Sequence, residues 1–275
     1  MGKQKSGLPS LDLIHQKRKL GWMITDKRGV DVRALLILLM SCLALFFVPT
    51  SVSAQEKTGV RDGFELKPGT ARILFLAPNI RVGAQSTGGL FEPNADWTAQ
   101  ARENINVALE QALRNLGNEI TRADETANPA VDELQPYRHL FGAVSGSAME
   151  YQFFRGNRLP TKKRNKSFSW TVGPAISELA AVQGYDYVLF ITTRDAYGST
   201  GRKLLQMAAM FANIPVTSGE HVGYAGLVEV KTGNLVWLNA DMAMGGDPRK
   251  PEGAEKRVRQ LLEGFPGRPE ADSEK

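Results

Sequence analysis

The side chains that could do chemistry gather in two short polar stretches of this 275-residue chain. The first directly follows the apolar run Tyr187–Ile191, and the second follows a predicted β-hairpin. The residues are Arg194, Asp195, Tyr197, Ser199 and Arg202 in the first stretch, and Asp247 and Arg249 in the second. In open α/β sheets, ligands bind beyond the carboxyl ends of the strands. If both stretches reach that edge, their three guanidinium groups could bind a small anion or another ligand, or assist hydrolysis.

A second interpretation of the same residues stays open and is preferred. The stretches carry arginines next to aspartates, and opposite charges close together in sequence often satisfy one another. In that case Arg194, Asp195, Arg202, Asp247 and Arg249 form ion pairs that tie loops together. No catalytic residue is assigned, and an enzyme is the less favoured class.

Motifs for metals, cofactors and nucleophilic catalysis are missing from the sequence. His15, His139 and His221 lack the spacing of metal ligands, and Cys42 is the only cysteine. The glycine-rich stretch 81–93 places Gly89 where a phosphate loop needs lysine, so it is expected to be a flexible, turn-forming loop. The stretch 198–203 lacks phosphate-loop spacing too. We therefore expect no metal and no cofactor.

The first 54 residues have the layout of a basic leader and signal peptide. The apolar segment Ala34–Val48 follows Arg33 and leads to small residues that end at Ala54, which predicts cleavage between Ala54 and Gln55. An uncleaved membrane anchor is the main alternative. Met1 or Met23 could be the true start, and lipidation of Cys42 is a further, less favoured alternative. The expected location is periplasmic or secreted, or else anchored in the inner membrane and facing the periplasm.

The net charge of +5 belongs to the leader rather than to the folded part. Residues 1–54 contain eight Lys and Arg against three Asp, so residues 55–275 hold equal numbers of acidic and basic side chains. This balance gives no reason to expect nucleic acid as a partner. A membrane is expected to contact only the amino-terminal segment.

Periodicity predicts a single three-layer α/β domain with a mixed sheet and the order β-α-β-α-α-β-α-β-β-α. The expected strands are Ala71–Ala77, Glu119–Ala123, Asp186–Thr193, and a hairpin of His221–Val230 with Leu235–Met242. The expected helices are Asn94–Leu116, Pro129–Phe154, Ala175–Val182, Leu204–Ala212 and Glu252–Phe265. The predicted boundaries are a leader at 1–54, a flexible lead-in at 55–69, the domain at 70–266 and a disordered tail at 267–275.

The segment Leu204–Ala212 is apolar on nearly every side. A helix of this kind is usually buried, so a core helix is the preferred interpretation. The alternative is a surface for self-association, a protein partner or membrane insertion. Its side chains would be Leu204, Leu205, Met207, Met210 and Phe211.

Several segments together resemble known envelope proteins. They are ARILFLAP at 71–78, GYDYVLFITT at 184–193 and the hairpin GYAGLVEVKTGNLVWLN at 223–239, with a closing amphipathic helix. This order is similar to the small α/β domain of bacterial envelope accessory proteins, which include the curli secretion channel family. The amino-terminal domain of the Tol-system propeller protein and the lipoprotein activators of penicillin-binding proteins are of the same type. The resemblance implies a periplasmic, non-enzymatic domain that binds proteins or assembles at the envelope.

Overall fold

The computed structural model describes residues 56–125, 128–154, 157 and 167–268. The expected signal segment, Cys42, the cleavage pair Ala54 and Gln55, and positions 269–275 of the expected tail lie outside the described residues. Within the described ranges, no helix is both long enough and apolar enough to cross a membrane.

The described residues form a nine-stranded mixed sheet, which confirms the predicted fold class. The strands are β1 (Glu56–Val60), β2 (Arg72–Phe75), β3 (Asn79–Gln85), β4 (Phe91–Pro93), β5 (Glu119–Arg122), β6 (Trp170–Thr171), β7 (Tyr187–Gly198), β8 (Glu220–Glu229) and β9 (Asn234–Asp241). The main order is β1-β9-β8-β7-β2-β5. In addition, β3 pairs with β7 and β4, and β6 pairs with β9. The pairs β2/β5, β2/β7 and β3/β7 are parallel, and the others are antiparallel.

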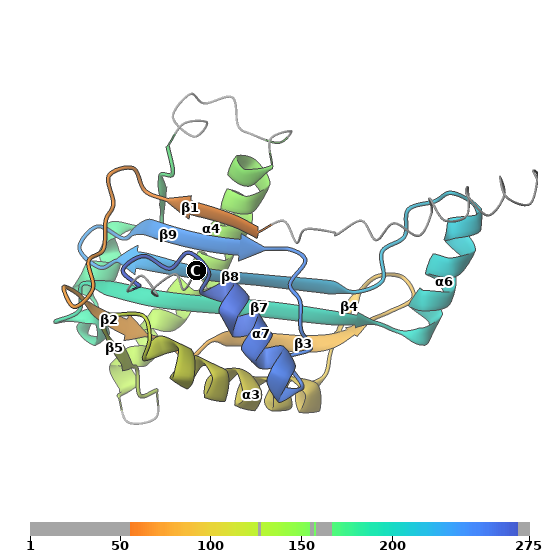
Figure 1. Cartoon of the computed structure of the whole chain (residues 1–275), viewed down its shortest axis with the longest axis horizontal. Coiled ribbons are helices and arrows are strands. Elements are labelled where there is room, and N and C mark those ends of the chain that lie inside the picture. Colours follow the sequence, from red (N-terminus) through yellow and green to blue (C-terminus); the bar gives the residue numbers. More distant parts are fainter. Residues whose placement is uncertain (1–55, 126–127, 155–156, 158–166, 269–275) are drawn as a thin grey trace, which may run out of the picture. The chain divides into compact units, whose positions relative to one another are not determined.

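Helices cover both faces of the sheet (Figure 1). The α-helices are α3 (Ala95–Leu113), α4 (Gln135–Ala148), α6 (Thr200–Phe211) and α7 (Pro251–Leu261). Shorter helical segments are Pro129–Leu134, Met149–Phe153, Pro174–Glu178 and Ala180–Val182. The core against α3 and α7 contains Leu189 and Ile191 of β7, and the core against α4 contains Val188 and Phe190. Alternate residues of β7 thus enter opposite cores, as expected for a strand in the middle of a sheet.

The central strand β7 is longer than the sequence indicated. We expected it to end at Thr193, but it continues to Gly198. Residues Arg194–Gly198 pair with β3 on one side, and Arg194–Ala196 pair with β8 on the other. The polar stretch after Thr193 is therefore part of the sheet, because two neighbouring strands satisfy its backbone groups.

The glycine-rich region 81–93, which we expected to be a flexible loop, forms most of β3 and all of β4. A Cβ on Gly83 would overlap the backbone carbonyl oxygen of Glu92 in β4. Gly83 thus marks a close approach of two strands rather than a loop. Only residues 86–90 connect β3 to β4.

Two other segments also differ from expectation. The lead-in 55–69 includes β1, which pairs with β9 from Glu56↔Asp241 to Val60↔Trp237. The expected helix Ala175–Val182 is instead two short 3-10 helices separated by Leu179. The hairpin of β8 and β9 and the helices α3 and α7 lie where the sequence predicted them.

Candidate functional site

The polar residues predicted after the central strand lie on both faces of β7. Asp195 and Tyr197 face the side covered by α3 and α7, whereas Arg194 alternates to the opposite side. The Arg194 guanidinium lies 3.5 Å from the Glu220 carboxylate and 4.8 Å from the centre of the Phe91 ring. Because the sheet separates Arg194 from Asp195, the two side chains do not share a site.

Ser199 and Arg202 hold the beginning of α6. The Ser199 hydroxyl accepts a hydrogen bond of 3.2 Å from the backbone N–H of Arg202, so it caps the helix. The Arg202 side chain donates to the carbonyl oxygens of Thr217 at 2.8 Å and Thr87 at 3.2 Å. These contacts fasten α6 to two neighbouring loops.

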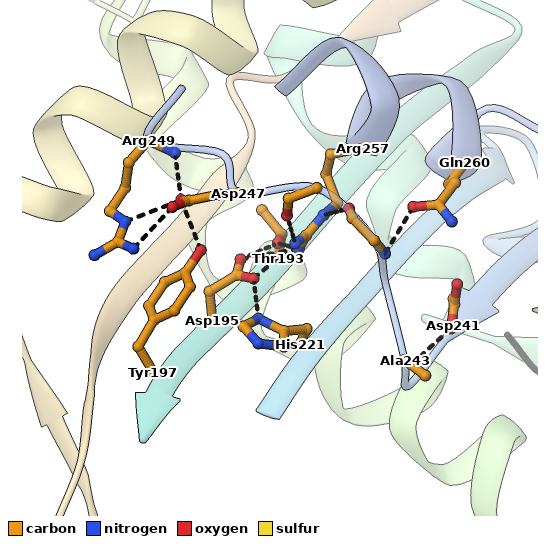
Figure 2. Close-up of polar contacts among 12 residues, drawn as sticks. Thr193, Asp195, Tyr197, His221, Asp241, Ala243, Asp247, Arg249, Arg257 and Gln260 are labelled. Atoms are coloured by element: carbon orange, nitrogen blue, oxygen red, sulfur yellow. Dashed lines mark hydrogen bonds and ion pairs between the residues drawn. The ribbon is translucent and has the colours of Figure 1, made fainter. Parts of the chain in front are cut away.

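Asp195 and Arg257 form a fully buried ion pair at the centre of the remaining cluster (Figure 2). Arg257 comes from α7, and its two terminal nitrogens donate to the two carboxylate oxygens of Asp195 at 2.9 and 2.8 Å. The same guanidinium donates to Thr193 at 3.2 Å and to the carbonyl oxygens of Gly245 at 3.0 Å and Gly246 at 2.7 Å. All five guanidinium N–H groups therefore have acceptors.

His221 of β8 is the second partner of Asp195. Its Nδ1 lies 2.7 Å from Asp195 Oδ1, and its ring packs edge-on against Tyr197 with centroids 5.0 Å apart. A histidine–aspartate pair resembles part of a catalytic triad, which also needs a nucleophile on the other ring nitrogen. In the described part of the chain, the imidazole makes no hydrogen bond other than the one at Nδ1. The pair therefore lacks the geometry of a triad.

Asp247, Arg249 and Tyr197 form a third set of contacts beside this ion pair (Figure 2). The Arg249 side chain donates to both oxygens of Asp247, at 2.9 and 2.8 Å, and the Tyr197 hydroxyl donates to Oδ1 at 2.8 Å. The hydrogen bonds from Arg249 hold the pKa of Asp247 well below its usual range. Burial and the bond to Asp247 raise the pKa of Tyr197. The guanidinium also lies 3.8 Å from the Tyr197 ring centre and 4.6 Å from that of Trp97.

Each of the charged residues singled out from the sequence has a protein partner. Asp195, Tyr197, Asp247 and Arg249 are brought together, and the charged ones are paired, Asp247 with Arg249 and Asp195 with Arg257. The cluster ties the 242–250 segment and α7 to the sheet. This agrees with the interpretation as an ion-pair network.

Sequence reasoning missed Thr193, His221 and Arg257 as members of this cluster. For Arg257 a signal was available, because the apolar face of the last helix runs through Ala254, Val258 and Leu261. An arginine at a position three residues after Ala254 falls on that face and must find a buried acceptor. Its partner could not be read from spacing alone, since Asp195 lies in a distant strand.

The helix α6 is exposed, contrary to the preferred expectation of a core helix. Of its residues only Ala209 is buried, whereas Phe211 is 94% and Met210 70% exposed. Figure 1 shows α6 at the far end of β7 and β8, away from α3, α4 and α7. We define the α6 surface as the exposed apolar side chains of this region. They are Leu204, Leu205, Met207, Met210, Phe211 and Ile214.

Comparisons with known proteins give only a distant similarity. No protein-family model matches the chain, and no curated protein matches it. A structure described as the PelC dodecamer from Paraburkholderia phytofirmans is 11% identical, with 75% of this chain and 93% of that chain covered and a TM-score of 0.32. A dodecamer of a PelC variant from the same organism is 13% identical, with coverages of 75% and 94% and the same TM-score. A TM-score of 0.32 is too low to support any argument about function.

Proposed function

We propose that this protein is an exported, non-enzymatic assembly domain of the bacterial envelope that self-associates through the α6 surface. The observation that carries the proposal is the exposure of six large apolar side chains on one projecting helix and the segment after it. Export rests on the signal-like sequence of residues 1–54. The resemblance of the strand and hairpin sequences to envelope accessory domains supports the same role.

The size of the α6 surface fits a contact between two copies. Its exposed side chains amount to an area on the order of 700 Å², more than the few hundred Å² common for apolar patches on monomeric proteins. Two such surfaces packed together would bury at most roughly 1,400 Å², and the range of a stable interface begins at about 1,200 Å². Contact with a second copy would therefore remove the exposed apolar side chains of α6 from water.

The α6 surface also has the chemistry of a protein interface core. No charged residue occurs from Leu204 to Gly219, and Met and Phe are enriched at such cores. The base of the helix is held by Ser199 and Arg202, so its orientation is fixed before any partner binds. A membrane surface fits less well, because a helix that lies on lipid usually carries several basic residues and α6 has only Arg202 and Lys203.

The alternative function, anion binding through Arg194, Arg202 and Arg249, has less support. Arg194 approaches Glu220, Arg202 donates to two carbonyl oxygens, and Arg249 is paired with Asp247. An anion would have to replace these contacts one by one. The three guanidinium groups also belong to three different parts of the fold.

The test is the mass of the purified full-length gene product, measured by sedimentation over a wide range of concentration. We expect a concentration-dependent oligomer, and we expect the pair of changes Met210→Ser and Phe211→Ser to weaken it more than tenfold, or about 1.4 kcal/mol. These side chains are exposed, so the folded monomer should persist. Val107→Ser, which removes a 55% exposed valine from α3, is the matched control and should leave the oligomer unchanged.

Two results would count against the proposal. One is a wild-type protein that stays monomeric at every concentration. The other is sedimentation with vesicles of anionic lipid, lost in the α6 variant, without any self-association. That second result would assign the α6 surface to a membrane.

A further inference from the structure

A separate cavity of about 370 Å³ opens where β2 and β5 end, away from the cluster around Asp195. Its floor is the segment Ala77–Ile80, which follows β2. The first helix of the fold, α3, contributes Arg102 and Asn106. The other side chains come from β5 and the chain after it and from α4, and they are Arg122, Glu125, Gln135, Arg138 and His139.

The topology makes this a place where an α/β fold can bind a ligand. From β2 the chain passes through α3 to β5 on one side, and then through α4 to β7 on the other side of β2. The two helices pack on opposite faces of the sheet, since α3 belongs to one core and α4 to the other. The crevice between two such connections, at the carboxyl ends of parallel strands, is the usual ligand position in open α/β sheets.

The charges around the cavity favour an anion. Among the described residues, three arginines and one carboxylate line it, Arg102, Arg122, Arg138 and Glu125, which is a formal excess of two positive charges that Glu110 beside Arg122 reduces to one. Arg122 is 40% exposed, donates to Asn106 at 3.2 Å and lies 3.6 Å from Glu110. Arg102 is exposed, and within the described ranges it has neither a hydrogen bond nor an ion pair.

The protein already holds one carboxylate at this position. Glu125 Oε1 accepts a hydrogen bond of 3.2 Å from the backbone N–H of Ala77, at the end of β2, and a second one from Arg138. Arg138 also donates to Gln135 at 3.3 Å. Its Nε is buried and has no hydrogen-bond partner among the described residues. The Ala77 N–H and the Arg138 guanidinium thus hold an oxygen anion here, which is the Glu125 carboxylate, and the exposed Arg102 and Arg122 lie beside it.

We propose that this cavity binds the phosphate group of a small molecule. A phosphate monoester carries a charge of about −1.5 to −2 at neutral pH, and the excess of positive charge around the cavity attracts such an anion. Its oxygens suit the fork of an arginine side chain. The cavity is larger than a phosphate group, so the remainder of a small phosphate ester fits beside it.

Isothermal titration of the purified full-length protein with inorganic phosphate and with glycerol phosphate tests this proposal. We expect saturable binding of one ligand per chain, tighter for the ester if the rest of the cavity is used. Equal affinity for both ligands would identify free phosphate as the occupant. Arg102→Gln should weaken binding at least tenfold without unfolding, because the side chain is exposed and has no hydrogen bond or ion pair with the described residues.

Two further variants distinguish binding in this cavity from a general attraction of phosphate to positive charges on the protein surface. Arg259→Gln removes an exposed arginine of α7 that does not line the cavity, and it should leave the affinity unchanged. Glu125→Gln removes the only carboxylate among the described residues of the lining and should tighten phosphate binding several-fold, which a purely structural carboxylate would not do. Wild-type protein that shows no saturable binding at millimolar ligand would overturn the proposal. So would equal losses from Arg102→Gln and Arg259→Gln. Because α6 does not line this cavity, neither result bears on self-association.

Discussion

At the scale of single residues, the main chemical feature is the burial of two opposite charges in one contact. Asp195 and Arg257 are fully buried, and each is surrounded by further hydrogen-bond partners. The net stabilisation by such a pair is small, because desolvation offsets much of the attraction. Removal of one partner is costly, since it leaves an uncompensated charge in the protein interior.

Replacement of Arg257 by methionine should therefore reduce the free energy of unfolding by about 3–5 kcal/mol. Adding Asp195→Asn to Arg257→Met should restore part of that loss, because no buried charge then remains unpaired. Urea denaturation of the three proteins measures both effects. Arg259→Met, on the exposed side of the same helix, should change the stability by less than about 0.5 kcal/mol. A cost for Arg257→Met as small as that of the control would contradict the importance of the pair.

Asp247 should make the stability depend on pH. Its pKa is lowered in the folded protein, mainly by the hydrogen bonds from Arg249. A carboxylate of this kind adds stability above its unfolded pKa of about 3.9 and loses it as the pH falls below that value. Asp247→Asn should therefore cost about 1 kcal/mol at pH 7. This cost should begin to shrink as the pH falls below about 4, and it should disappear only as the pH falls through the lowered folded pKa of Asp247.

Urea denaturation of both proteins between pH 3 and pH 7 would show this cost begin to shrink at the acidic end of the range. The exposed Asp62, changed to asparagine, serves as the control and should give nearly parallel curves. A cost for Asp247→Asn that stays constant down to pH 3 would show that the hydrogen-bond geometry matters and the charge does not.

At the scale of elements, the β8–β9 hairpin depends on one glycine. Gly233 has φ +67°, and a Cβ there would overlap the carbonyl oxygen of Gly173, which lies on another part of the chain. Gly233→Ala should cost about 1–3 kcal/mol, through backbone strain and this overlap. Thermal unfolding gives the loss. Gly142→Ala in α4 is a control with the opposite sign, since no atom lies near its Cβ and alanine favours a helix by about 0.5–1 kcal/mol.

The elements with strong local signals were predictable from the sequence. The face of α3, the buried run in β7 and the hairpin turn at Gly233 each follow from local periodicity or turn chemistry. The extension of β7 beyond Thr193 was not predictable in this way, because Arg194–Gly198 are held as strand by pairing with β3, a distant segment. For the same reason, the glycines near residue 83 indicated a loop where the chain forms β3.

The candidate site was predictable only as a set of residue types. Asp195, Tyr197, Asp247 and Arg249 were recognised and do meet, but the partner that neutralises Asp195 lies in α7. The exposure of α6 was missed because its composition is that of a core helix, and composition does not show whether the rest of the fold reaches it. Only the spatial arrangement distinguishes a buried helix from an interface.

At the scale of the whole molecule, the proposed export would leave a mature protein without a thiol. Cys42 is the only cysteine, and it lies before the proposed cleavage site. If Gln55 is the first residue of the mature protein, its intact mass should correspond to residues 55–275 and a thiol reagent should not react with the denatured chain. Mass spectrometry of protein from the periplasmic fraction checks both expectations. Full-length protein in the cytosol would contradict export.

The pairing of β1 with β9 has a consequence for how the sheet is completed. The earliest strand of the described chain and the last one are neighbours, with Glu56 opposite Asp241. Contacts between such distant positions form slowly, because a long loop must close first. Synthesis must therefore be almost complete before this edge can close. Until then the edge of β9 that β1 covers in the complete fold lacks this neighbour.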